Sequence, residues 1–171
     1  MAVREIVKFG HPVLSSRAEE IGEIDDEIRD LALDMVETMH KSPGIGLAAP
    51  QVNRSLRLIT VDLSIGEKPE ELIVLVNPEI VESSGESESV EGCLSVPDIQ
   101  DKVTRPSLVV VRGLDLEGRE RVIEAKDLMA RVFCHEIDHI NGKLFVDRLS
   151  PLKKSLIRKK LKKKRTPDSA R

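Results

Sequence analysis

Residues 127–142 have the sequence DLMARVFCHEIDHING, which is the most informative pattern in the chain. Asp127 is a residue type that often caps the start of a helix, and Gly142 is typical of a helix end. We therefore expect a helix over residues 127–141. Its apolar residues spread round most of the helical circumference, which is usual for a helix buried at the centre of a domain. They are Leu128, Met129, Val132, Phe133, Ile137 and Ile140.

The same stretch contains the pattern His-Glu-x-x-His at residues 135–139. Residues four apart on a helix share a face, so His135 and His139 can bind one metal ion. Glu136 lies beside them and could take a proton from water activated by the metal. Because an unpaired Glu in a buried helix would be costly, we predict that this Glu is used in a metal centre.

A catalytic metal site usually has three protein ligands and a fourth position open to water. Two groups of metalloproteases take a third ligand downstream, but Phe145 stands where one group needs His, and no Glu follows Glu136. Cys93, in the stretch EGCLSVP at 91–97, is the best candidate, since a thiolate binds zinc or ferrous iron strongly. Weaker candidates are His11, His40 and Asp147.

The rest of the chain mixes helical and strand patterns. Apolar residues recur with helical spacing over residues 25–41, which predicts an amphipathic helix. We expect a loop or an exposed hairpin at the polar residues 82–89, and a third helix that starts at Ser150 and Pro151. Alternating patterns predict strands at 56–62, 72–77, 107–116 and 119–125, with a turn at 117–118.

Composition limits the class of protein. The length of 171 residues fits one domain, and the absence of Trp and Tyr argues against binding nucleic acid by base stacking. We find no signal peptide and no run of the roughly 20 apolar residues that span a membrane, so we expect a cytoplasmic protein. Two cysteines do not make a disulfide framework.

Charge is distributed unevenly along the chain. Ten of the 27 Lys and Arg residues lie in residues 151–171, where Asp168 is the only acidic residue, although the whole chain has a net charge of −3. The chain is thus an acidic body with a basic tail. Such a tail often contacts nucleic acid or an acidic partner, and the alternative is a solvated helix that keeps the protein soluble.

Three motifs occur in a fixed order: GIGLAAPQ at 44–51, EGCLS at 91–95 and HEIDH at 135–139. Together they resemble the peptide deformylase family, whose signatures are G-x-G-x-A-A-x-Q, E-G-C-x-S and H-E-x-x-H. The similarity extends over nearly the whole chain. It implies an α+β fold with antiparallel β-sheets packed around a central HExxH helix, and a C-terminal helix. It also implies one catalytic domain over residues 1–165, including the basic helix 150–165, and a tail at 166–171 that we expect to be disordered.

The resemblance assigns chemistry to individual residues. It implies that Cys93, His135 and His139 bind one divalent metal ion, with Fe²⁺ as the native ion and Zn²⁺ or Ni²⁺ able to replace it. Glu136 is then the general base and acid. The Gln51 side chain and the backbone N–H of Leu94 form the oxyanion hole. The implied reaction is hydrolysis of the N-terminal formyl group of formyl-methionyl nascent proteins, with release of formate.

The resemblance also assigns substrate contacts and supporting residues. The backbone of Ile45 and Gly46 pairs with the substrate as an added strand. Leu128 and Val132 line an apolar pocket for the methionine side chain, although plain core packing would explain both residues as well. The remaining supporting residues are Glu91 and Arg105.

Two positions depart from the family pattern. Gln100 stands where the best-known members have Arg near the substrate entrance, and Arg131 replaces an apolar residue near the pocket. The basic C-terminal helix resembles a segment with which some members dock on the ribosome, and no DNA or membrane partner is expected. Two other hypotheses stay open at this point, a zinc endopeptidase and a protein with a structural metal and an RNA-binding tail.

Overall fold

The computed structural model describes residues 2–169, and the side chains of residues 2–163. The helices in chain order are α1 (Asp26–Lys41), α2 (Asp127–Ile140) and α3 (Pro151–Ser169). Short 3-10 helices are η1 (Pro12–Ser15), η2 (Ala49–Val52), η3 (Pro69–Glu71) and η4 (Phe145–Arg148). The strands are β1 (Gly46–Ala48), β2 (Leu58–Val61), β3 (Ile73–Ser84), β4 (Ser87–Cys93), β5 (Val96–Arg105), β6 (Leu108–Leu114) and β7 (Glu120–Lys126).

The strands form two antiparallel sheets, so the expected α+β class is confirmed. The larger sheet has the order β1-β2-β3-β6-β7, and the smaller one consists of β4 and β5. The four predicted strands correspond to β2, the first half of β3, β6 and β7. The predicted turn joins β6 to β7, where Asp115 N–H donates to the Arg119 carbonyl and Gly118 has a φ of +81°.

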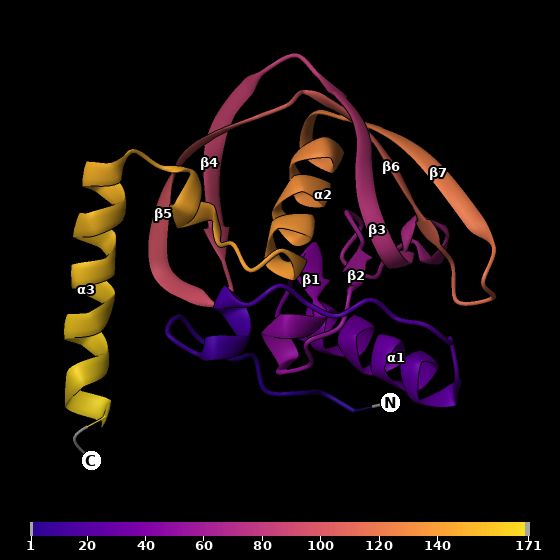
Figure 1. Ribbon diagram of the computed structural model, residues 1–171, viewed down its shortest axis with the longest axis horizontal. Helices are drawn as coiled ribbons and strands as arrows, with labels where there is room; N and C mark the ends of the chain where they lie inside the picture. The colour runs from indigo at the N-terminus through magenta and orange to yellow at the C-terminus, as the bar shows by residue number, and fades with distance from the viewer. Residues whose placement is uncertain (1, 170–171) are drawn as a thin grey trace.

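Residues 82–89 form neither a loop nor a hairpin of their own, so that prediction was wrong. β3 continues to Ser84 and β4 starts at Ser87, but β3 pairs with β6 whereas β4 pairs with β5. The two pairings follow one another, and the resulting ribbon arches over α2 (Figure 1). The residues at the end of β3 are exposed on both faces, and the polar side chains therefore do not show the alternation that identifies a strand.

α1 matches the predicted amphipathic helix. The Asp25 side chain accepts a hydrogen bond of 3.0 Å from the backbone N–H of Ile28, which caps the first turn. One face of the helix is buried and packs against β1 and β2. This face consists of Ile28, Leu31, Ala32, Met35, Thr38 and Met39.

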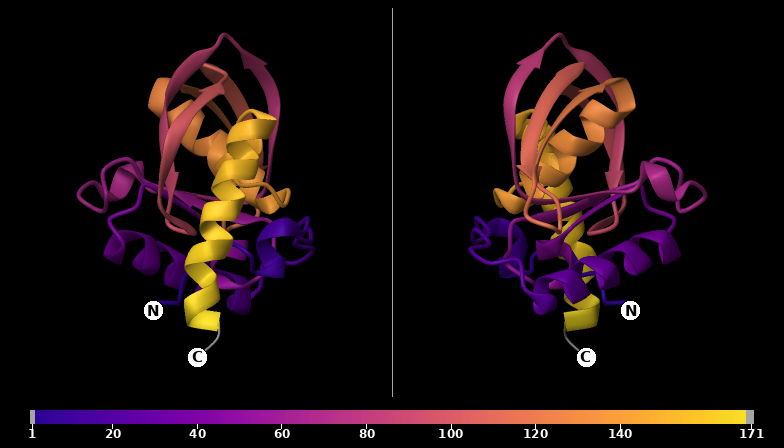
Figure 2. Two further views of the ribbon diagram at one scale, coloured as in Figure 1. Left: turned by 90° about the vertical axis from the view of Figure 1, so that its left-hand side faces the viewer. Right: turned by 90° about the vertical axis from the view of Figure 1, so that its right-hand side faces the viewer.

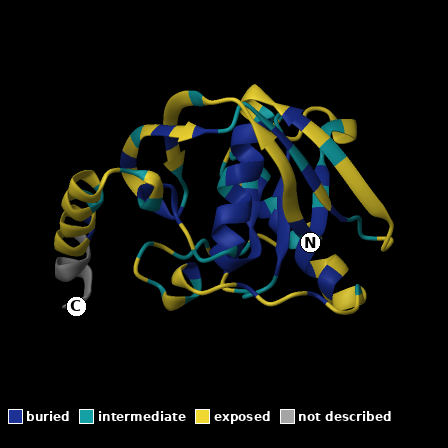
Figure 3. Ribbon diagram, turned by 45° about the horizontal axis from the view of Figure 1, so that its top comes forward, coloured by how far each residue is buried: buried dark blue, intermediate teal, exposed yellow. Residues whose placement is uncertain are grey.

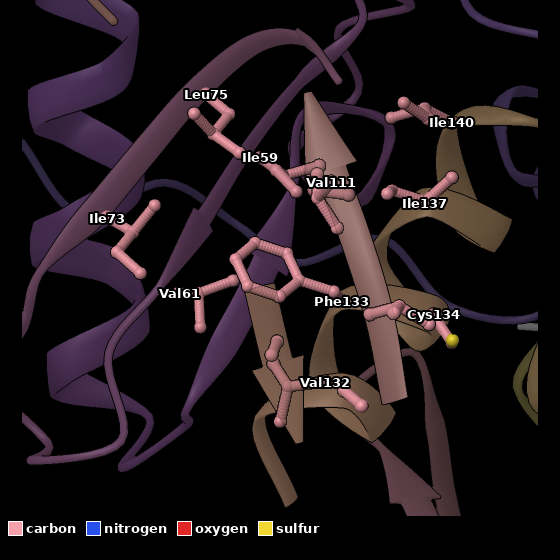
Figure 4. Packing of buried hydrophobic residues seen from close by; sticks show 14 of the residues in the cluster. Ile59, Val61, Ile73, Leu75, Val111, Val132, Phe133, Cys134, Ile137 and Ile140 are labelled. Carbon is pink, nitrogen blue, oxygen red and sulfur yellow. The ribbon is translucent and has the colours of Figure 1, made fainter. Parts of the chain in front are cut away.

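α2 packs against strands of both sheets, and almost its whole circumference is buried (Figure 3). Its Phe133 and Ile137 meet aliphatic side chains of the larger sheet, among them Ile59 and Val111 (Figure 4). Each such fully buried side chain contributes about 1.5–3 kcal/mol relative to exposure. The core therefore fixes α2 rigidly, which matters because α2 contains the HExxH residues.

The two ends of α2 differ from each other. Asp127 is not the N-cap: it is the first helical residue, with a φ of +53°, and the cap position is Lys126, which makes no side-chain capping hydrogen bond. The C-terminal prediction is confirmed. Gly142 has a φ of +78° and its N–H donates to the His139 carbonyl, while Lys143 N–H donates to the Asp138 carbonyl. These two bonds form a Schellman motif, which favours glycine.

α3 begins at Pro151, as predicted, and lies beside the body of the molecule (Figures 1 and 2). Ile157 and Leu161 pack against a cluster from β5 and η4 that includes Phe145. The α3 backbone continues to Ser169, beyond the expected end at 165, and residues 170–171 of the expected tail lie outside the described residues. Within residues 2–169, no helix is both long enough and apolar enough to cross a membrane.

Candidate metal centre and active site

The structure brings Cys93, His135 and His139 together. The two histidines lie one turn apart on α2, with their Nε2 atoms 3.2 Å from each other. Cys93 ends β4, and its Sγ lies 3.4 Å from His139 Nε2. All three potential ligand atoms lie within 4.8 Å of one another. The weaker candidates make other contacts, with Val13 for His11, Asp62 for His40, and Lys154 and Arg158 for Asp147.

This arrangement fits a divalent metal ion. The two imidazole nitrogens face each other at hydrogen-bonding distance, and the thiol lies beside them. Their lone pairs converge on one place, where they could coordinate a cation. The donor set of one sulfur and two nitrogens suits zinc or ferrous iron. Burial lowers the pKa of His139 well below its usual range, and this favours the neutral ring that binds metal. Within the described residues the group has three members, which leaves a fourth position for water.

Glu136 lies beside this group and is almost completely buried. Its Oε1 atom is buried and has no hydrogen-bond partner within the described residues. Burial raises the pKa of Glu136 to about 7, because a buried carboxylate loses its hydration. A carboxyl group of this kind, next to a metal centre, is suited to accept and release a proton.

Glu91, in β4, connects His135 of α2 to Arg105 of β5. Its Oε1 lies 3.0 Å from His135 Nδ1, and Arg105 donates two hydrogen bonds of 2.9 Å to its two carboxylate oxygens. Burial alone would raise the pKa of Glu91, but the hydrogen bonds from Arg105 and His135 outweigh it and lower the pKa to about 2. An ionised Glu91 favours the His135 tautomer with the proton on Nδ1, which leaves Nε2 free for a metal.

Gln51 and Leu94 both lie next to Cys93. Gln51 belongs to η2 and is 2% exposed. Its Oε1 accepts a hydrogen bond of 3.0 Å from Ala48 N–H, and its Nε2 lies 3.2 Å from Ser95 Oγ and 3.6 Å from Cys93 Sγ. Leu94 lies in the turn between β4 and β5, next to Cys93. Both residues therefore border the place where the three ligands converge.

A cleft of about 480 Å³ opens beside these groups. It is lined by the segments 43–46 and 90–94, by Gln51 and by residues of α2. All four residues predicted to contact substrate line it, namely Ile45, Gly46, Leu128 and Val132. Leu128 is 52% exposed whereas Val132 is 5% exposed, so core packing does not explain Leu128. Gln100 and Arg131 also line the cleft.

Comparison with known proteins assigns this arrangement to a family. A model of the polypeptide deformylase family matches residues 3–155. A peptide deformylase of Thermodesulfovibrio yellowstonii is 50% identical over 165 residues, which cover 96% of this chain and 100% of that protein. The chain belongs to the peptide deformylase family. It is therefore a metal-dependent hydrolase that acts on formylated nascent peptides, and the endopeptidase and structural-metal hypotheses give way to this activity.

Solved structures of peptide deformylases agree with this assignment. A crystal structure of a peptide deformylase from Legionella pneumophila superimposes with a TM-score of 0.90 at 45% identity, covering 99% of both chains. A plant peptide deformylase gives the same TM-score at 34% identity, covering 98% of this chain and 91% of that one. The deformylase fold thus extends over the whole described chain, including strands β3 to β6.

Sequence reasoning missed two residues that support the candidate site, Asp138 and Ser95. Asp138 lies inside HEIDH and accepts hydrogen bonds from Arg105 and Arg148. Ser95 is fully buried and contacts Gln51. For Asp138 a signal was present, because a charged residue in a helix that is buried on nearly all sides must have a partner. Nothing in the sequence alone indicates which arginines supply it.

Proposed function

We propose that this chain removes the formyl group from formyl-methionyl nascent peptides with Glu136 as general base and acid. The observation that supports this role most directly is the buried carboxylate of Glu136. It has an unpaired oxygen and lines a cleft beside three converging candidate metal ligands. Water adds to the formyl carbon, the C–N bond breaks, and the products are formate and a free α-amine. Glu136 takes a proton from the water and passes it to the leaving nitrogen.

We propose that Cys93, His135 and His139 hold the metal ion that this reaction needs, with Fe²⁺ as the native ion and Zn²⁺ or Ni²⁺ as substitutes. A divalent ion bound there would act as a Lewis acid and lower the pKa of water in the open position. The thiolate and imidazole donors support both iron and zinc, and the preference for iron comes from the family resemblance. Glu91, held by Arg105, orients His135 as a ligand.

Gln51 Nε2 and the N–H of Leu94 would donate hydrogen bonds to the formyl oxygen, where negative charge develops. The backbone of Ile45 and Gly46 would pair with the peptide as an added strand. This proposal is supported by the sheet order, because β1 is an edge strand and its first residue, Gly46, lines the cleft. Leu128 and Val132 would contact the methionine side chain.

The decisive experiment compares formate release from formyl-Met-Ala-Ser by the parent enzyme and by Glu136→Gln, both loaded anaerobically with Fe²⁺. The substitution keeps the side chain's size and removes its basicity, so kcat should fall by roughly 10²–10⁴-fold. Equal metal content in both proteins is the control. If Glu136→Gln retains full activity, its proposed role is wrong. Cleavage of internal bonds in unformylated peptides would instead favour an endopeptidase.

We also propose that the enzyme works in the cytoplasm and docks on the ribosome through α3. The helix displays Leu152 and Leu156, which are 71% and 57% exposed, among exposed lysines. Phosphate-rich RNA would attract those lysines in a salt-dependent way.

The test is co-sedimentation with ribosomes at increasing salt. Reversing three exposed charges of α3 should abolish binding, whereas reversing Lys41, Lys68 and Lys126 elsewhere should leave it intact. The three in α3 are Lys159, Lys160 and Lys163.

A further inference from the structure

Arg131 lines the cleft, yet its guanidinium is hydrogen-bonded to oxygen atoms of the protein. The side chain is 7% exposed, although it lies next to the pocket proposed for an apolar methionine. Nη1 donates to Glu91 Oε2 at 2.5 Å and to the Val103 carbonyl at 2.9 Å. Nη2 donates to the Ser87 carbonyl at 2.7 Å and to Ser87 Oγ at 3.0 Å. These protein oxygens thus occupy both terminal nitrogens.

These contacts join the two elements that supply the metal ligands. Ser87 and Glu91 belong to β4, which ends at Cys93, and Val103 belongs to the paired strand β5. Arg131 itself belongs to α2, one turn before His135. The spacing between the thiol and the imidazoles therefore depends on how the β4–β5 ribbon sits on α2. Arg131 fixes that placement from the helix side, while Arg105 fixes it from the ribbon side.

Arg131 also acts on the carboxylate that orients a ligand. Glu91 Oε2 accepts hydrogen bonds from both Arg131 and Arg105, while Oε1 faces His135 Nδ1. With Arg105 bound to both oxygens and Arg131 to one of them, the carboxylate plane cannot rotate without breaking a charge-assisted hydrogen bond. The ring of His135 is held in turn. Such outer partners of a metal ligand typically affect metal affinity by 10- to 100-fold.

We propose that Arg131 is a positioning residue of the metal centre, acting on His135 through Glu91 and on Cys93 through the ribbon. The inference rests on the proposed metal ligands and goes beyond them, because Arg131 contacts neither the metal nor the substrate. It also explains how the cleft tolerates an arginine beside an apolar pocket. The charge is neutralised and hydrogen-bonded on the side facing the protein.

The test measures metal binding without any peptide substrate. Co²⁺ is titrated into the metal-free protein in competition with a chelator, and the absorption of its thiolate and imidazole complex is recorded. Arg131→Leu should bind Co²⁺ about 10- to 100-fold more weakly and change the visible spectrum. Arg57→Leu is the matched control, because Arg57 is equally buried and its side chain donates hydrogen bonds to the C-terminal end of α2, but none to Glu91 or to β4 and β5.

Arg131→Lys keeps the charge but not the planar fork that reaches three residues, so its Co²⁺ affinity should also fall. It serves as the test if the Leu variant does not fold. Parental affinity and spectrum in the folded Arg131 variants would overturn the proposal, as would equal losses in Arg57→Leu. An increase in KM confined to peptides with an acidic second residue would also overturn it, because Arg131 would then contact substrate. Since Co²⁺ binding needs no turnover, failure of the proposed hydrolysis would be seen separately.

Discussion

The backbone of Gly46 lies directly against the carboxylate of Glu136. A Cβ atom on Gly46 would lie 2.5 Å from Glu136 Oε2 and 2.9 Å from a methyl carbon of Val132. No side chain fits at these distances without moving the proposed base. Gly46→Ala should therefore lower kcat/KM for formyl-methionyl peptides by about 10²-fold, since a displacement of about 1 Å in a catalytic group has effects of this size. Overpacking should also destabilise the protein by about 1–3 kcal/mol.

Gly22→Ala provides the control for this substitution. A Cβ on Gly22 would have no neighbour within 4 Å. We expect full deformylase activity and a free energy of unfolding within about 0.5 kcal/mol of the parent. Steady-state kinetics measure kcat/KM of both variants, and urea unfolding measures their free energy of unfolding. Parental kcat/KM in Gly46→Ala would show that Glu136 does not need its present position.

Gln51→Leu tests the oxyanion hole, because leucine has a similar size but donates no hydrogen bond. We expect kcat to fall by roughly 10²–10³-fold with little change in KM, since the lost interaction forms mainly in the transition state. The Ala48 N–H would also lose its acceptor, which should cost about 1–3 kcal/mol of stability.

The kinetic pattern distinguishes this role from others. A rise in KM at constant kcat would mean that Gln51 binds the ground state and transition state equally, and the oxyanion assignment would be wrong. Ser95→Ala is the companion variant, because it removes the hydroxyl group that accepts a hydrogen bond from Gln51 Nε2. It should keep most of the activity, since the Gln51 amide remains in place.

Sequence patterns predicted the elements whose two faces differ strongly in polarity. In α1 the residues from Ile28 to Met39 repeat with helical spacing, and in α2 the apolar residues and HExxH appear together, so both helices were found. The end of β3 and strand β4 were missed because most of their residues are exposed to solvent. Burial there does not impose a period-two pattern that a sequence could show.

The sequence was enough to name the three candidate ligands and the supporting residues Glu91 and Arg105, but not the contacts that Arg131 makes. Cys93 could be inferred because thiolate chemistry and the failed alternatives restrict the choice of a third ligand. The direction of the Arg131 side chain could not be inferred. It depends on Ser87 and Val103, which are brought near only by the bend of the ribbon. Long-range pairing of this kind leaves no trace in local sequence.

Leu128→Ala tests the methionine pocket. Leu128 lines the cleft and is half-exposed, so methionine would cover it on binding. Losing this contact should weaken transition-state binding of formyl-methionyl peptides by about 1–2 kcal/mol, which lowers kcat/KM by about 5- to 30-fold. Formyl-alanyl peptides, whose side chain is too short to reach it, should react at the parental rate.

The control is Leu33→Ala, because Leu33 is 44% exposed on α1 and does not line the cleft. Both leucine variants should keep nearly parental stability. An equal loss of activity on both formyl-methionyl and formyl-alanyl peptides in Leu128→Ala would contradict the pocket assignment, since the effect would then not depend on the methionine side chain.

Asp147 links α3 to the body and should make stability depend on pH. It accepts hydrogen bonds from Leu144 N–H at 2.9 Å and from Arg158 at 3.1 Å, and it lies 3.0 Å from Lys154 Nζ. Burial opposes ionisation, but these contacts outweigh it and lower the pKa of Asp147 below its usual range. A lowered folded-state pKa stabilises the protein above the unfolded value of about 3.9, and the contribution is lost as the pH falls through the folded-state pKa.

Asp147→Asn should therefore destabilise the protein at pH 7, and the difference from the parent should shrink as the pH falls below about 4. Urea unfolding of both proteins at several pH values measures this difference, and any protonation of metal ligands affects both alike. Asp30→Asn, at an exposed position of α1, should show little difference at any pH. A difference that stays constant down to pH values well below 4 would mean that the charge of Asp147 does not hold α3, and that its backbone contact to Leu144 accounts for the effect.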